Sequence, residues 1–80
     1  MSDITPDLEV DLRGLLCPMP MVKMSQAVLE VPVGATVRAV ATDAGALADI
    51  PAWARSTGRG EVLQAEQVGA EYVFVVRRLL

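Results

Sequence analysis

The stretch that decides the fold is Asp11-Leu12-Arg13-Gly14-Leu15-Leu16-Cys17-Pro18-Met19-Pro20, where a strand pattern gives way to a helix pattern. Before it, the run Leu8 to Leu12 alternates apolar and acidic residues, which is the period of a half-buried strand. Gly14 can adopt backbone angles that are closed to other residues, so the chain can turn there. The two prolines lack N–H groups that a first helical turn leaves unbonded, and they mark a helix start. Cys17, the single cysteine, is therefore expected at the start of a helix.

A first helix and a second strand follow this stretch. Apolar residues recur at helical spacing from Pro18 onward, and we expect Pro32 and Gly34 to stop the helix; its apolar face is Met21, Met24, Ala27, Val28 and Val31. The run from 36 to 42 is short, apolar and partly β-branched, which is typical of a strand.

A second helix is predicted by the apolar face of Leu47, Ile50, Trp53, Ala54 and Thr57, and it should stop at Gly58. Pro51 would cost about 3 kcal/mol inside a helix. We therefore expect a separate turn near residues 46–50 and a main helix that begins at Asp49 or Ile50, with Asp49 as its cap.

The C-terminal part reads as a hairpin. Runs 61–68 and 72–79 have strand character, and the three residues 69–71 between them include a glycine. The complete order is βαβαββ, which predicts an α+β fold: a four-stranded mixed sheet with both helices on one face. We expect a single domain over residues 8–80 and a frayed segment over residues 1–7.

Composition narrows the class of protein. With 52% hydrophobic and 21% charged residues, the 80-residue chain is globular rather than disordered. Its net charge of −3 argues against direct nucleic-acid binding. One cysteine and no histidine leave no ordinary metal site, and we expect no cofactor. No signal peptide or membrane span is expected, so a cytoplasmic monomer is predicted.

Cys17 is the candidate for chemistry. A helix N-terminus favours the thiolate, which is the nucleophilic form, and Arg13 four residues upstream would add positive potential. Pro18 and Pro20 would hold the loop rigid. The alternative is a buried cysteine that acts as a small hydrophobic residue, and position alone leaves the two interpretations equally supported. Turn and cap roles explain Asp11, Asp43 and Asp49 more simply than catalysis does.

The residues that carry a family resemblance extend from Glu9 to Arg78: Asp11, Arg13-Gly14-Leu15, Cys17-Pro18-x-Pro20, Gly34, Thr42-Asp43, Asp49-Ile50-Pro51, Trp53 and Gly58. In this order they resemble the TusA/SirA-like sulfur-carrier family. The resemblance implies a two-layer α/β sandwich and a cysteine, here Cys17, that accepts sulfane sulfur as a persulfide, with Arg13, Gly14, Pro18 and Pro20 in support. It implies a carrier more than an enzyme; as an enzyme it would be a sulfurtransferase.

The resemblance also implies partners. A cysteine desulfurase or a rhodanese-type protein would donate sulfur, and an acceptor protein would receive it in tRNA thiolation, molybdenum-cofactor supply or sulfur oxidation. Met19, held between two prolines, is a candidate partner contact. The family commonly has Gly-His where this chain has Gly58-Arg59-Gly60, so a general base is impossible there and Arg59 is instead a candidate for docking an acidic partner.

Two other functions compete with this hypothesis. The chain would be a small regulatory interaction module if Cys17 is incidental to its function. It would be a thiol-dependent peroxidase or a sulfurtransferase with its own turnover only if further catalytic groups existed. The absence of histidine and of a second cysteine ranks that interpretation last.

Overall fold

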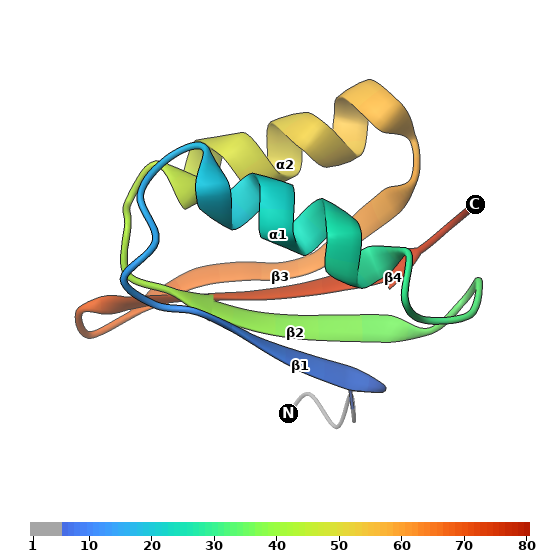
Figure 1. Ribbon diagram of the computed structural model, residues 1–80, viewed down its shortest axis with the longest axis horizontal. Coiled ribbons are helices and arrows are strands. Elements are labelled where there is room, and N and C mark those ends of the chain that lie inside the picture. Colours follow the sequence, from blue (N-terminus) through green and yellow to red (C-terminus); the bar gives the residue numbers. More distant parts are fainter. Residues whose placement is uncertain (1–5) are drawn as a thin grey trace.

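The computed structural model describes residues 6–80, and in it the predicted βαβαββ order is confirmed (Figure 1). The elements are β1 (Leu8–Leu12), α1 (Met19–Val28), β2 (Thr36–Ala41), α2 (Ala46–Thr57), β3 (Gly60–Val68) and β4 (Glu71–Arg78). The strands form one layer and the two helices lie together on one face of it (Figure 1). The two-layer α+β prediction is therefore correct.

The four strands form one mixed sheet in the order β1-β2-β4-β3. Strands β1 and β2 are parallel neighbours, with Leu8 opposite Val37. Strand β4 runs antiparallel to both β2 and β3. The β3–β4 hairpin is tighter than predicted, because β4 already begins at Glu71 and only two residues lie between the strands. This order puts the C-terminal ends of β1 and β2 side by side at one edge of the sheet.

The core lies between the sheet and the helices. Alternate residues of each strand face the helices, as the period of two requires: in β1, Leu12 is fully buried while Asp11 beside it is exposed. The largest fully buried side chains come from both layers and are Phe74, Leu12, Met24, Ile50, Val28, Val37, Val76 and Pro20. Burial of these side chains, at about 1.5–3 kcal/mol each, fixes the helices on the sheet.

Helix α1 begins where the prolines predicted. Pro18 is its N-cap residue and Pro20 lies in its first turn, where a missing N–H costs nothing. The helix ends earlier than expected, at Val28, with the N–H groups of the next two residues bonded three residues back in a tight turn. Val31 still packs in the core, but it does so from outside the helix.

Helix α2 is continuous from Ala46, and two predictions about its start are wrong. Pro51 lies inside it, and Gly45 rather than Asp49 is the N-cap residue. The missing Pro51 N–H removes a single helical hydrogen bond, the one that the Leu47 carbonyl would accept, and Leu47 is itself an exposed residue. The proline is therefore tolerated. Asp49 is left free to point elsewhere.

The N-terminal prediction is partly corrected. Residues 1–5 lie outside the described residues, whereas Asp7, expected to be frayed, is fixed to β2. Its N–H donates to the Thr36 carbonyl at 2.9 Å, and its carboxylate accepts the Thr36 N–H at 2.9 Å. These two bonds extend the pairing of β1 and β2 by one residue.

Candidate functional site

Cys17 belongs to the β1–α1 loop. This loop lies beside the β2–α2 loop (Figure 1). Both loops leave the C-terminal ends of parallel neighbouring strands, so they emerge at the same edge of the sheet. They are tied by two hydrogen bonds: Gly14 N–H donates to Thr42 Oγ1 at 2.9 Å, and Cys17 N–H donates to Asp43 Oδ2 at 2.6 Å. Cys17 itself is a free, exposed thiol, two residues before the first residue of α1.

Asp43 fixes the backbone around the thiol. One of its carboxylate oxygens accepts the Cys17 N–H, and the other accepts the Gly45 N–H at 3.4 Å. Gly45 allows the close approach, since a Cβ built there would lie 3.3 Å from Cys17 Cβ and 3.7 Å from Cys17 Sγ. Thus the turn role expected for Asp43 is correct, and the turn it forms places the start of α2 against the cysteine.

The thiol of Cys17 forms a hydrogen bond with a second carboxylate, that of Asp49. Cys17 Sγ donates to Asp49 Oδ2 at 2.6 Å, across 32 positions of sequence. Asp49 reaches the sulfur from the first turn of α2. A cysteine held in this way differs from the inert, buried cysteine of the alternative interpretation, because its sulfur faces solvent and a charged group at once.

The electrostatics of Cys17 contradict the sequence prediction. The hydrogen bond to Asp49, some desolvation, and the negative charges of Asp49 and Asp43 all raise the pKa of the thiol above its ordinary value of 9.0. We expected a lowered pKa from the helix N-terminus, and that expectation is wrong. Asp49 accepts the hydrogen of the thiol and Asp43 accepts the N–H of the same residue, so both carboxylates favour the thiol form of Cys17 over the thiolate.

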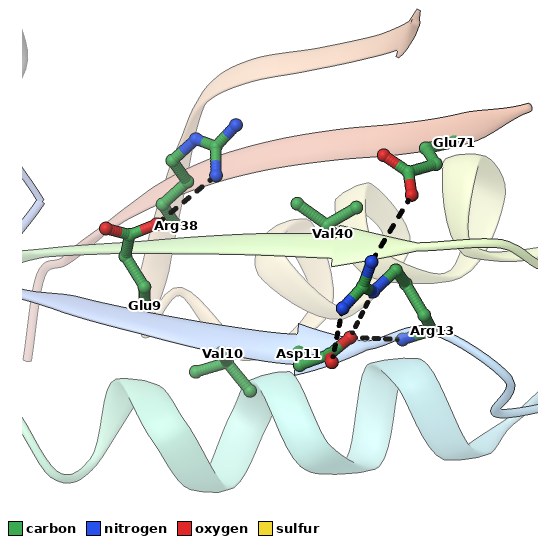
Figure 2. Close-up of a pocket in the computed structure, with 7 residues that line it drawn as sticks. All are labelled: Glu9, Val10, Asp11, Arg13, Arg38, Val40 and Glu71. Atoms are coloured by element: carbon green, nitrogen blue, oxygen red, sulfur yellow. Dashed lines mark hydrogen bonds and ion pairs between the residues drawn. The ribbon is translucent and has the colours of Figure 1, made fainter. Parts of the chain in front are cut away.

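Arg13 does not supply positive potential to Cys17. Its guanidinium binds Asp11 through two nitrogens, at 2.9 and 3.0 Å, and lies 3.8 Å from a Glu71 oxygen (Figure 2). This pair lowers the pKa of Asp11 to about 2, chiefly through the side-chain hydrogen bond from Arg13. Arg13 therefore shapes the turn after β1 and does not assist the thiol directly.

Figure 2 shows the surface pocket that contains this pair, a hollow of about 390 Å³ over β1, β2 and the start of β4. A second ion pair, Arg38 with Glu9 at 3.3 Å, closes its other end. The pocket does not include Cys17. The charged side chains that line this pocket form ion pairs with one another, so none of them is left unpaired to act on a bound molecule.

The surface around Cys17 carries exposed apolar side chains. Leu16 is 74% exposed and Met19 is 40% exposed, one on each side of the Cys17-Pro18 pair. A shallow groove of about 320 Å³ between the helices begins at Asp49 and continues past Trp53 to Thr57. Arg59, by contrast, follows the C-terminal end of α2, at the opposite end of that helix from Asp49.

Sequence reasoning missed the role of Asp49. It assigned the residue to a helix cap on the basis of Pro51 alone. A signal was nevertheless present, because the loops after parallel neighbouring strands lie at the same sheet edge, and Cys17 and Asp49 follow two such strands.

Within residues 6–80, no group of three or more His, Cys, Asp or Glu side chains is placed to hold a metal ion. In the same part of the chain, neither helix is long and apolar enough to cross a membrane.

Comparison with known proteins gives the family. The model of the family described as sulfurtransferase TusA matches residues 8–78. The chain belongs to the TusA family. The sulfur carrier protein TusA of Pseudomonas putida is 32% identical over 78 residues, which are 98% of this chain and 96% of the relative. A Halobacterium salinarum protein, provisionally named a sulfur carrier, is 37% identical over 76 residues, 95% of this chain and 91% of its own.

The fold is shared with a solved structure. The crystal structure of a SirA-like protein from Desulfitobacterium hafniense matches with a TM-score of 0.71, covering 91% of this chain and 99% of that chain. The two sequences are 19% identical, so this likeness bears on the fold alone. It agrees with the mixed four-stranded sheet and the two helices described above.

Proposed function

We propose that this protein is a sulfur carrier in a sulfur relay, and that Cys17 holds the travelling sulfur as a persulfide. The observation that carries the proposal is the exposed thiol at the joined loops of a TusA-family domain. The relatives named sulfur carriers align over nearly the whole chain. A carrier needs one accessible sulfur on a rigid surface, and Asp43, Gly45 and Pro20 supply that rigidity.

The transfer needs no second catalytic residue in this chain. Cys17 Sγ attacks the outer sulfur of a donor persulfide, a new S–S bond forms at Cys17, and the donor's own S–S bond breaks. The proton that leaves Cys17 ends on the departing donor sulfur, which becomes a thiol. Atoms and electrons balance without an oxidant or a reductant. Delivery to the acceptor is the same exchange in reverse order.

The donor in this proposal is a cysteine desulfurase or a rhodanese-type protein, and the acceptor is a second protein of tRNA thiolation, molybdenum-cofactor supply or sulfur oxidation. Such partners present the sulfur on a protein surface, which suits an exposed thiol with no enclosing pocket. We place the relay in the cytoplasm, where reducing conditions keep a single cysteine free. One copy of the chain suffices for each transfer.

Met19 and Arg59 remain the proposed partner contacts. Met19 is exposed beside the thiol, where a docked partner must come close. Arg59 is also exposed, but α2, a helix of 12 residues and about 18 Å, separates it from the site. We expect Met19→Ser to slow loading at limiting donor concentration while alkylation of Cys17 is unchanged. Arg59→Ser should slow loading only from a donor that covers the full length of α2.

Mass spectrometry tests the proposed function. After incubation with a cysteine desulfurase and cysteine, or with a rhodanese and thiosulfate, the protein should gain about 32 Da, the mass of one sulfur atom, and lose it on reduction. Cys17→Ser should gain nothing. If the unaltered protein gains no sulfur from either donor, the carrier function is wrong, and the protein is better described as an interaction module with an incidental cysteine.

A further inference from the structure

The two carboxylates at Cys17 make different contacts. Both oxygens of Asp43 accept backbone N–H groups, those of Cys17 and Gly45. Asp49 presents Oδ2 to the sulfur itself. Asp43 therefore fixes the loop, and Asp49 acts on the group that reacts.

We propose that Asp49 is a positioning residue that holds the Cys17 thiol protonated in the free protein, and so keeps an exposed sulfur slow to react until a partner docks. The inference rests on the proposed sulfur-carrier function for its biological meaning. The contact itself depends on geometry: a thiol donates its hydrogen to the carboxylate at 2.6 Å, whereas a thiolate at that distance is a second anion and is repelled. Losing the proton therefore breaks the contact.

The charged groups that act on the sulfur all have the same sign. Asp49 on α2 and Asp43 in the preceding loop each favour the protonated form of Cys17. On the cysteine's own loop, Arg13 is bound to Asp11 and Glu71. The free protein thus offers the thiolate no cation from this loop. A docked partner is the remaining source of a group that displaces Asp49 from the sulfur.

Alkylation by iodoacetamide as a function of pH tests this role. The variant is Asp49→Asn, and the matched control is Glu30→Gln, which removes one exposed carboxylate charge beyond the C-terminal end of α1. For each pH unit that the titration midpoint of Cys17 falls, the thiolate fraction at pH ~7 rises about tenfold and its intrinsic nucleophilicity falls about threefold. We therefore expect Asp49→Asn to react about three times faster than the unaltered protein at pH ~7 for each pH unit by which its midpoint is lower. Glu30→Gln should react at the rate of the unaltered protein.

The alkylation rates at alkaline pH show whether Asp49 acts through its charge or by covering the Cys17 sulfur. Above both midpoints every molecule is a thiolate, and the more basic thiolate of the unaltered protein should then react as fast as Asp49→Asn or faster. The two curves should cross. A variant that is faster at every pH would show that Asp49 only shields the sulfur, and a midpoint equal to that of the unaltered protein would also overturn the inference. Asp49→Ser, with a residue that suits a first helical turn, serves as a second uncharged variant.

Sulfur loading of the same proteins separates this inference from the function on which it rests. If the unaltered protein gains sulfur while the midpoints of both Asp49 variants are unchanged, the inference is wrong and the carrier function stands. If the midpoints fall but no protein gains sulfur from any donor, Asp49 controls the thiol and the carrier function is wrong. The expected result is both a lower midpoint and sulfur loading that persists in Asp49→Asn.

Discussion

Replacing Asp43 by alanine should loosen the loop that presents the thiol. The carboxylate joins the β1–α1 loop to the β2–α2 loop through a charge-assisted hydrogen bond of 2.6 Å to the Cys17 N–H. Its second bond, to the Gly45 N–H, is 3.4 Å long and adds little. Asp43→Ala removes both. Asp43→Asn retains one carbonyl oxygen and can keep the shorter bond without the charge.

The magnitude follows from the first of these bonds. Hydrogen bonds to charged groups contribute about 1.5–3 kcal/mol, and half-exposure of Asp43 puts it below that range, at about 1 kcal/mol. A chain of this size has a urea m-value of about 1 kcal/mol per M. Asp43→Ala should therefore lower the urea midpoint by about 1 M. Asp43→Asn should fall roughly halfway, because a neutral acceptor forms a weaker bond.

Urea unfolding followed by circular dichroism gives the midpoints, and amide hydrogen exchange gives the local effect. We expect protection of the Cys17 amide to fall by about fivefold in Asp43→Ala, the equivalent of about 1 kcal/mol, and less in Asp43→Asn. An alanine variant with the midpoint and the Cys17 protection of the unaltered protein would refute the assignment of Asp43 as the tie between the loops. An asparagine variant as unstable as alanine would show that the charge, rather than the bond, stabilises the loop.

Two further changes test other parts of the structure. Gly60→Ala should lower the free energy of unfolding in urea by about 1–3 kcal/mol, because the new Cβ would lie 2.8 Å from Val76 Cγ1 and 2.9 Å from Trp53 Cζ3. In a double-mutant cycle with Val76→Ala, the two losses of stability should be less than additive, and full additivity would exclude the clash. Arg13→Gln should raise the pKa of Asp11 from about 2 toward 3.8 in an NMR titration. Because the folded-state pKa is the lower one, the pair stabilises the fold above pH 3.8, and this stabilisation is lost as the pH falls through about 2. An Asp11 pKa that does not change in Arg13→Gln would contradict the pairing.

The fold was largely predictable because its elements have clear periods. Strand β1 was placed to the residue by its alternation. The start of α1 was found from its prolines, although the helix ends at Val28, before the expected stop at Pro32. The start of α2 was not found, because Pro51 was taken as a break in the helix, whereas the helix begins at Ala46 and accommodates Pro51 in its second turn. The two-residue hairpin turn was also missed by one residue, since Glu71 is as compatible with a turn as with the end of a strand.

Only the part of the site that lies next to Cys17 in the sequence could be predicted. Cys17 was found from its own neighbours, and the turn at Gly14 and the helix start at the two prolines are where the local pattern placed them. The partners of the thiol lie 26 and 32 residues further on, in a loop and a helix whose position depends on strand pairing. The direction in which the pKa of Cys17 moves depends on those partners, so it was predicted with the wrong sign.

The wrong sign has a physical explanation in the helix ends. Both α1 and α2 begin near Cys17, since α1 starts two residues later and Gly45, the N-cap residue of α2, lies against the cysteine, and a helix N-terminus alone would favour a thiolate. At α2, however, Asp49 lies in the first turn and Asp43 bonds the N–H of the cap residue Gly45, so carboxylates already meet the positive end of that helix. These two carboxylates complement the helix dipole, and the Asp49 hydrogen bond and the charges of Asp49 and Asp43 raise the pKa of the nearby Cys17 thiol. Removing Asp49 therefore does two things at once: it takes away an anion and returns the helix end to Cys17, and both effects move the thiol toward the reactive thiolate.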